Sequence, residues 1–238
     1  MQVQNNSQGC NFRCARKPLI MDRIDKILKL LISAYGDRTP ARRLEPVDEL
    51  VLTILSQNTS DINSRRAFKS LTVSLGGWDR VAHASRARVA QAIRAGGLAD
   101  VKSRYILGAL QYLAKQAGGY DLRFLKDMEM WEARAWLMRL PGVGMKTASC
   151  VLLFSLDMPA FPVDTHVLRV AGRLGLVAPK TTADSAHLEM ERLVQPEDTY
   201  RCHLLMIEHG RSTCRARNPL CDLCIISSQC PSYNKLKA

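Results

Sequence analysis

The chain has 238 residues and 47% of them are hydrophobic, so it can bury a substantial core and is not a disordered tail. No apolar run reaches the roughly 18 residues that a membrane helix needs, and the N-terminus lacks the apolar stretch of a signal peptide. We therefore expect a cytoplasmic protein with no membrane partner. We further expect a monomer.

The formal net charge of +12 indicates a polyanionic partner, and nucleic acid is the one expected for such a protein. Arginine is more frequent than lysine, which favours bidentate contacts with phosphate. The alternative is a basic surface that serves only solubility.

The apolar residues recur at helical spacing, and long stretches of alternating polarity are absent, so we predict an all-α fold. Residues 1–20 are polar and are expected to form a disordered tail, in which Cys10 and Cys14 make at most a weak metal motif. Helices are expected at about 21–35, 50–55, 61–75, on both sides of 95–104, at 128–140 and from about 145 to 155.

The stretch "LPGVGMKTASC" begins at Leu140 and predicts a tight glycine turn between two helices. It is not a nucleotide-binding P-loop, because Met145 rather than glycine precedes the lysine and because a helix rather than a strand precedes the turn. Gly142 and Gly144 allow positive φ and close approach of a backbone, and the N–H groups that open the next helix can bind a phosphate. A turn that only packs two helices is the structural alternative.

Lys146 lies in the first turn of that next helix, where the helix dipole disfavours a cation and favours the neutral, nucleophilic amine. Asp164 follows a break at Pro159 and Pro162 and is expected to N-cap another helix. The short intervening helix would let this carboxylate return beside the amine and take its proton or stabilise a sugar cation.

The third motif is a run of four cysteines within 17 residues, spaced C-x6-C-x2-C-x5-C. Such a set can enclose one metal centre, and the uneven spacing favours a [4Fe–4S] cluster over a single zinc ion, which remains the alternative. Two arginines in the first loop would be held rigidly, either to contact DNA phosphates or to neutralise the thiolates. These residues are Cys214, Cys221, Cys224 and Cys230, with Arg215 and Arg217 between the first two.

Together, the segments "LPGVGMKTA", "VDTHVLRVAGRLGL" and "HGRSTCRARNPLCDLCIISSQC" resemble the endonuclease III family of DNA base-excision glycosylases. The resemblance runs from about Met21 to Pro231. It implies two helical domains flanking a DNA-binding cleft: a helical domain at 45–158 that contains a helix-hairpin-helix, and a discontinuous iron–sulfur domain at 21–44 plus 159–238.

The resemblance also implies a mechanism and a partner, which is double-stranded DNA carrying a damaged base or an abasic site. The damaged nucleotide is flipped out of the duplex, and Lys146 attacks C1′ and displaces the base. The resulting Schiff base permits strand cleavage by β-elimination, and Asp164 activates the amine. Damaged pyrimidines, chiefly oxidised ones, are the expected substrates, and on its DNA the protein would be associated with the nucleoid. Lysine at this position argues against the adenine-glycosylase branch.

The residues that contact the bases correspond less closely to the family pattern. In "LSQNTSD", Asn58 takes the position of the family's glutamine and Gln57 precedes it, and either amide could bond the orphaned base. Leu98 matches an apolar wedge position, with ordinary core as the alternative. Asp61 matches a polar pocket position but could also be a helix cap, and His166 is expected to support the pocket.

Two other functions fit parts of this pattern. One is a monofunctional glycosylase of the same fold with another base preference. The other is a non-catalytic helix-hairpin-helix protein with a metal-stabilised loop, which would need neither Lys146 nor Asp164.

Overall fold

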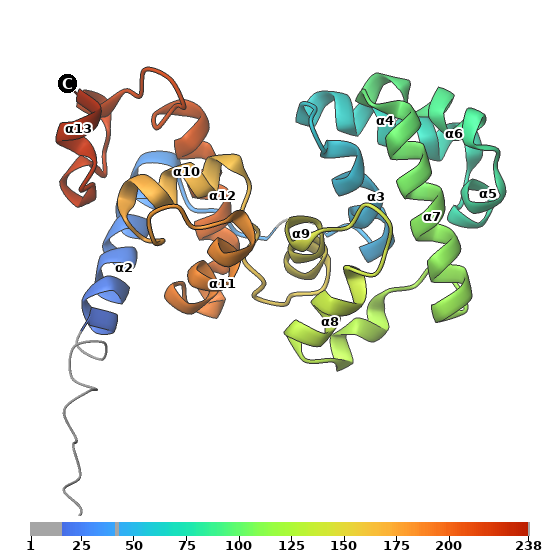
Figure 1. The fold of residues 1–238 in the computed structure, drawn as a ribbon, viewed down its shortest axis with the longest axis horizontal. Helices are drawn as coiled ribbons and strands as arrows, with labels where there is room; N and C mark the ends of the chain where they lie inside the picture. Colours follow the sequence, from blue (N-terminus) through green and yellow to red (C-terminus); the bar gives the residue numbers. More distant parts are fainter. Residues whose placement is uncertain (1–15, 41–42, 238) are drawn as a thin grey trace, which may run out of the picture. The chain divides into compact units, whose positions relative to one another are not determined.

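The computed structural model describes residues 16–40 and 43–237, and within them every regular element is helical, which confirms the all-α prediction. The chain forms two compact units (Figure 1). One comprises Met1–Thr39 with Val163–Ala238, and the other comprises Pro40–Pro162. We call them the cysteine-loop unit and the hairpin unit. Among the described residues, no helix is long and apolar enough to cross a membrane.

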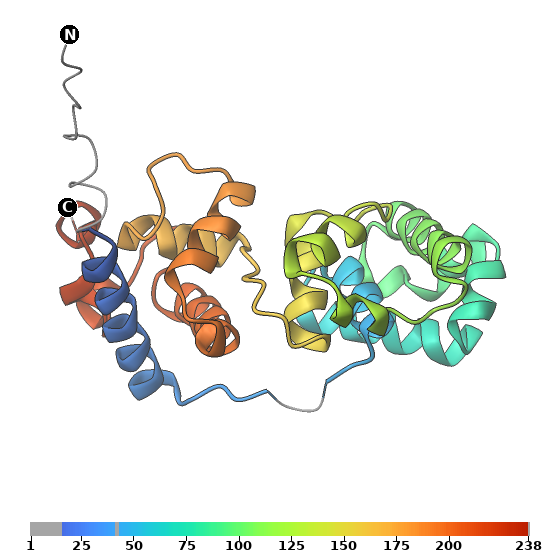
Figure 2. The same cartoon turned by 90° about the horizontal axis from the view of Figure 1, so that it is seen from below.

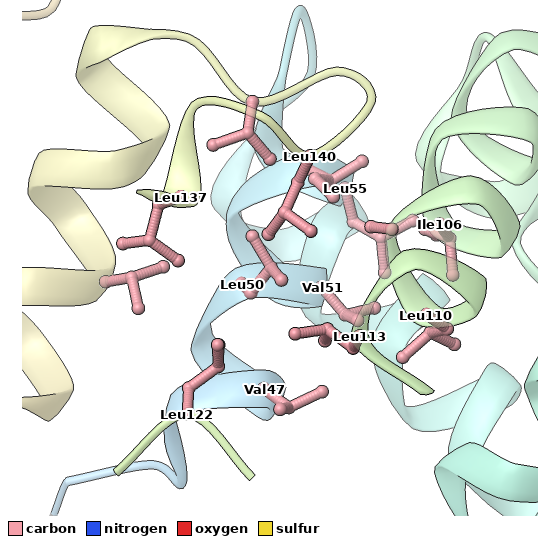
Figure 3. Packing of buried hydrophobic residues seen from close by; sticks show 14 of the residues in the cluster. Val47, Leu50, Val51, Leu55, Ile106, Leu110, Leu113, Leu122, Leu137 and Leu140 are labelled. Atoms are coloured by element: carbon pink, nitrogen blue, oxygen red, sulfur yellow. The ribbon is translucent and has the colours of Figure 1, made fainter. Parts of the chain in front are cut away.

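The hairpin unit is built around a central helix, α3. Its apolar positions follow the helical repeat, and Leu50, Val51 and Leu55 are completely buried. Figure 3 shows these side chains packed near Leu137 at the end of α8 and near three residues of α7, Ile106, Leu110 and Leu113. The helices of this unit are α3 (Pro46–Ser56), α4 (Asp61–Leu75), α5 (Trp78–His83), α6 (Arg86–Ala92), α7 (Ala99–Ala117), α8 (Met130–Leu137) and α9 (Met145–Ser155), with the 3₁₀ turns η1 (Arg94–Gly96) and η2 (Arg123–Asp127).

Local signals explain where several of these helices begin and end. The Ser60 hydroxyl accepts a hydrogen bond from the Asn63 N–H at 3.3 Å and so caps α4. Gly76 ends the same helix with a φ of 82°. The short helix α5 was not predicted, because its six residues are too few to show a helical repeat.

A buried lysine joins three parts of the hairpin unit. Lys102 of α7 is 1% exposed, and its Nζ donates to the carbonyl of Leu55 at 2.7 Å and to that of Gly96 at 2.8 Å. Burial lowers the pKa of this ammonium group. The two carbonyls belong to the end of α3 and to η1, so one side chain ties both to α7.

The cysteine-loop unit brings the two ends of the described chain together. Figure 2 shows α2 (blue) beside the C-terminal segment (red). Arg23 of α2 donates to the carbonyl of Leu174 and, at 2.9 Å, to that of Gln229. The helices are α2 (Arg16–Tyr35), α10 (Thr165–Leu174), α11 (Ala183–Leu193), α12 (Thr199–Ser212) and α13 (Tyr233–Lys237), with the 3₁₀ turns η3 (Pro196–Asp198), η4 (Cys221–Leu223) and η5 (Ser227–Gln229).

The observed boundaries differ in detail from the expected ones. Helix α2 begins at Arg16, inside the segment expected to be a disordered tail. That prediction is therefore wrong for residues 16–20. Cys10 and Cys14 lie outside the described residues. The units divide after Thr39 and after Pro162, within a few residues of the predicted divisions at 44 and 158.

We predict that Lys102→Met destabilises the protein by about 2–3 kcal/mol, because two buried carbonyls lose their donor while the apolar stem is kept. Urea unfolding followed by circular dichroism measures the change. Lys115→Met, at an exposed position of the same helix, is the control and should shift the unfolding free energy by about 0.5 kcal/mol or less. Equal stability of the two variants would contradict a tying role for Lys102.

Candidate functional site

The glycine turn between α8 and α9 requires glycine at one of its two positions. Gly142 has a φ of 76°, and a Cβ placed there would lie 2.4 Å from the Tyr105 ring. Gly144 has a φ of −99° and open space around it, so the expected positive φ occurs at Gly142 and not at Gly144. The Val143 side chain is buried and its N–H donates to the Leu140 carbonyl at 3.1 Å, so the contact with DNA expected of this residue stays a prediction.

The start of α9 is suited to binding an anion. Gly144 is its N-cap and supplies no side-chain acceptor, and no acidic residue lies in the first turn. The first N–H groups of a helix have no acceptor within the helix and lie at the positive end of its dipole. The exposed Gly144 lets a phosphate approach them closely.

The two neighbouring amides of the α3–α4 turn have different surroundings. The Gln57 Nε2 donates to the carbonyl of Gly142 at 3.1 Å, so this side chain holds the turn against the hairpin. Asn58 is exposed and has a φ of 52°, a conformation that asparagine tolerates better than most residues. Asn58 is therefore the more accessible of the two amides.

Leu98 is not a core residue. Its relative exposure is 56%, and its φ of 49° places it in the left-handed region, directly after Gly97 at 67°. Lys102 contacts both sides of this loop, because its backbone N–H donates to the Leu98 carbonyl at 2.9 Å and its side chain binds Gly96. An exposed leucine on a firmly held loop fits the predicted wedge.

Asp61 is not the cap of α4. Ser60 fills that role, and Asp61 is the first residue of the helix and is exposed. The residue therefore lies at the surface of the hairpin unit, close in sequence to the turn that carries Asn58. Its predicted contact with the substrate stays a prediction.

Lys146 is partly buried in the first turn of α9 and has a carboxylate neighbour that the sequence reading missed. Burial raises the pKa of Glu49 on α3, although a hydrogen bond from the Thr53 hydroxyl at 2.9 Å and the positive charge of Lys146 act in the opposite direction. The sequence holds no signal for this pair, because Glu49 lies on α3 and Lys146 on α9, and only the fold brings the two helices together.

In the cysteine-loop unit, Asp164 caps α10 as predicted. Its Oδ1 accepts from the Val167 N–H at 2.8 Å, and its carbonyl accepts from Leu168 at 2.9 Å. The carboxyl group is partly exposed. His166 lies at the start of the same helix and accepts at Nδ1 from Arg169 at 3.1 Å, so its orientation is held from within the unit.

Two arginines of α10 join this helix to the cysteine loop. Arg169 donates to the carbonyls of Gly210 at 2.8 Å and Cys214 at 3.0 Å. Arg173 donates to the Cys214 Sγ at 3.3 Å and to the carbonyl of Arg215 at 2.7 Å. The arginine that meets a ligand sulfur is thus Arg173, which the sequence reading did not single out.

Arg215 and Arg217 are both exposed, as contacts with a backbone phosphate would require. The Arg215 Nε also donates to the Ser212 carbonyl at 3.0 Å, which restrains the base of this side chain. The alternative that these two arginines neutralise the thiolates has no support in the hydrogen bonds of Arg215, whereas Arg173 reaches a sulfur.

The four predicted ligand cysteines line one partly open cavity. Burial raises the pKa of the Cys224 and Cys230 thiols. Apolar side chains, including Val170, Leu174 and Ile226, complete the wall. Cys150 and Cys202 are buried elsewhere, and burial raises the pKa of Cys202 to about 12.

His209 was also missed and lies in the wall of this cavity. It is 1% exposed, and burial lowers its pKa to about 4, so its imidazole is neutral at physiological pH. Its Nδ1 is 2.9 Å from the Tyr35 hydroxyl and its Nε2 is 3.7 Å from the Cys224 Sγ.

We predict that Gly142→Ala destabilises the protein by about 2–4 kcal/mol, because alanine must adopt a positive φ and its Cβ meets the Tyr105 ring. Gly144→Ala is the matched control and should cost about 0.5 kcal/mol or less, since nothing lies within 4 Å of the added carbon. Chemical unfolding of both variants measures the difference, and equal losses would contradict the assigned geometry.

Comparison with known proteins places these features in a family. Residues 51–196 match the HhH-GPD superfamily of base excision DNA repair proteins. Endonuclease III of Sulfolobus acidocaldarius is 34% identical over 186 residues, which are 77% of this chain and 81% of that protein. Endonuclease III of Thermotoga maritima is 32% identical over 195 residues, which are 82% and 86% of the two chains.

A protein of Arabidopsis thaliana named as a DNA glycosylase is 37% identical over 171 residues. The match covers 71% of this chain but 58% of the plant protein, so the chain spans less than two thirds of that relative.

Solved structures show the same fold over nearly the whole chain. A trapped covalent intermediate of endonuclease III with DNA matches with a TM-score of 0.79 at 26% identity, covering 92% of this chain and 99% of that one. A non-covalent endonuclease III–DNA complex matches with a TM-score of 0.77 at 26% identity, covering 90% and 97%. The helical fold, with its glycine hairpin and capping aspartate, is the one these relatives predict. The chain belongs to the endonuclease III family within the HhH-GPD superfamily.

Proposed function

We propose that this chain is a bifunctional DNA glycosylase/AP lyase of base excision repair that uses Lys146 as its nucleophile. The observation that carries the proposal is the partly buried Lys146 in the first turn of α9, directly behind a glycine turn suited to phosphate. A protein that only clamps phosphate needs no such amine. The family supports the reaction class, since a covalent DNA intermediate is known for endonuclease III.

The chemistry requires a neutral amine at C1′ of a flipped nucleotide. The Lys146 Nζ attacks C1′, the C1′–N bond to the base breaks, and the base leaves with a proton. Loss of the amine's protons and ring opening give a Schiff base, which acidifies the C2′ hydrogens. Removal of one of them expels the 3′ phosphate by β-elimination and cuts the strand.

Asp164 is the proposed proton acceptor for Lys146 and stabiliser of the positive charge on the sugar. Its Oδ1 already accepts from the Val167 N–H, which fixes the orientation of the carboxylate. The second oxygen remains for the amine or the sugar.

We assign the DNA contacts to side chains and backbone groups of both units. The N–H groups of Gly144 and of the first turn of α9 take a phosphate. Leu98 enters the base stack, and Asn58 meets the orphaned base. Gln57 assists by holding the hairpin. Arg215 and Arg217 add phosphate contacts, in keeping with a net charge of +12.

The cysteine cavity fits a [4Fe–4S] cluster. All four candidate donors are thiols lining one cavity, and thiolates are the ligands of such clusters. Four thiolates can also bind a single zinc ion, which is the alternative that metal analysis decides. When bound, the cluster would link the cysteine loop covalently.

The finer properties follow from the same assignment. We propose oxidised pyrimidines in duplex DNA as substrates, action as a monomer, and a location in the compartment that holds the DNA. The preference among lesions depends on the α3–α4 turn, where Asn58 stands in place of the family's glutamine.

Borohydride trapping on duplex DNA with an abasic site tests the nucleophile. We expect the wild-type protein to give a covalent adduct and Lys146→Ala to give none, because borohydride reduces only the imine of the attacking amine. Absence of a wild-type adduct would refute the lyase and favour a monofunctional enzyme. An undiminished adduct in Lys146→Ala would refute the residue assignment.

Glu49 provides an internal comparison for the proton acceptor. Asp164→Asn should slow adduct formation about a hundredfold or more, whereas Glu49→Gln should slow it less, since a buried carboxyl with a raised pKa is the weaker electrostatic partner. A larger effect of Glu49→Gln would move the role of base to Glu49.

Metal analysis of anaerobically purified protein tests the cofactor. We expect about four iron atoms per chain and a broad visible absorption. Arg173→Met should release iron to a chelator faster than wild type, because Cys214 loses its hydrogen bond, while Arg217→Met at an exposed position should not. A colourless, zinc-containing protein would refute the cluster.

A further inference from the structure

A buried histidine holds the backbone immediately before Asp164. Val163 is 3% exposed, and its N–H donates to the Nε2 of His187 at 3.0 Å. His187 lies on α11, 24 residues further along the chain, and is itself 1% exposed. Both residues belong to the cysteine-loop unit.

The hydrogen bonds define the tautomer of this ring. The Nδ1 of His187 lies 2.7 Å from the carbonyl of Ala183, and a carbonyl can only accept, so the hydrogen is on Nδ1. The Nε2 then has a lone pair, which accepts the Val163 N–H. His187 therefore acts as a neutral bridge between the first turn of α11 and the backbone that enters α10.

As a result, Asp164 is restrained on both sides. The residue before it is held by His187, and its own Oδ1 and carbonyl are held by the Val167 and Leu168 N–H groups. These bonds restrict the backbone torsions that set where the carboxylate points. Small errors in the position of a reacting group can slow a reaction by up to about a hundredfold.

We propose that His187 is a positioning residue for Asp164, which fixes the backbone before it and so the orientation of its carboxylate. The inference rests on the proposed function, since it assumes that Asp164 takes part in the reaction. His187 itself is buried and acts only through the Val163–Asp164 backbone.

A second tether on the same helix offers a matched control. Glu189 of α11 accepts from the Ala178 N–H at 2.9 Å and from the Thr181 hydroxyl at 2.5 Å. Like His187, it holds the backbone of a neighbouring loop, but that loop follows α10 and does not lead into Asp164. Its removal should cost stability without changing the orientation of the carboxylate.

The test compares single-turnover rates of borohydride-trappable adduct formation on abasic duplex DNA, at saturating enzyme. We expect His187→Leu to lower the rate constant about ten- to hundredfold. His187→Gln can still accept the Val163 N–H through its amide oxygen and should recover most of the rate. Glu189→Leu should stay within about twofold of wild type.

Two further measurements separate positioning from general damage. The dissociation constant for duplex DNA with an uncleavable tetrahydrofuran abasic analogue should change less than about threefold in His187→Leu. In an Asp164→Asn background, His187→Leu should cause little additional loss, since residues that act through one another are non-additive. If His187→Leu does not fold, His187→Asn replaces it. The asparagine side chain is shorter and cannot reach both the Val163 N–H and the Ala183 carbonyl.

The outcomes distinguish failure of the proposed function from failure of the positioning role of His187. A wild-type protein that forms no adduct refutes the proposed function, and this inference with it. If the wild-type protein forms the adduct, the proposed function stands and three results would refute the positioning role alone. These are a wild-type rate in His187→Leu, an equally slow rate in Glu189→Leu, and losses that simply multiply in the Asp164→Asn background.

Discussion

The hairpin unit depends on the carboxyl end of α3, where helical carbonyls need donors that the helix cannot supply. The ammonium group of Lys102 meets the Leu55 carbonyl there and binds Gly96 at the same time. Two residues after Leu55, Gln57 reaches across to the Gly142 carbonyl. The turn with Asn58, the loop with Leu98 and the glycine hairpin are therefore all anchored to one helix end, and that end lies among the most buried side chains of the unit.

In the cysteine-loop unit, α10 has a comparable central position. Its first residue is capped by Asp164, and further along its length Arg169 and Arg173 bind the carbonyls and one sulfur of the cysteine loop. The cysteine loop and the proposed proton acceptor are thus connected through a single ten-residue helix. If the proposed cluster is bound, it would stiffen the loop and, through α10, the position of Asp164, without taking part in the reaction itself.

Helices, the glycine turn and the capping role of Asp164 could be predicted, because each depends on residues close together in the sequence. Asp61–Leu75 was predicted to the residue, since Ser60 and Gly76 mark its ends. Roles that depend on distant partners could not. Gln57 and Asn58 look equivalent until Gly142, 85 residues away, takes the glutamine amide. Glu49, Arg173 and His187 carry no motif and acquire their roles only from partners brought close by folding.

The anchoring of Leu98 and Asn58 to one helix end has a mechanical consequence. If Leu98 enters the duplex as proposed, it does so from a loop that Lys102 ties to the end of α3 through the Gly96 and Leu55 carbonyls, so this loop can adapt little to the duplex. The DNA duplex deforms more easily than such an anchored loop. Its stiffness varies with sequence and is lowest where base stacking is already weakened. The work of distortion then falls on the duplex. A damaged or mispaired base step would deform at this loop more easily than an intact one. The protein would then detect lesions first by how easily the duplex deforms, before any base is flipped out.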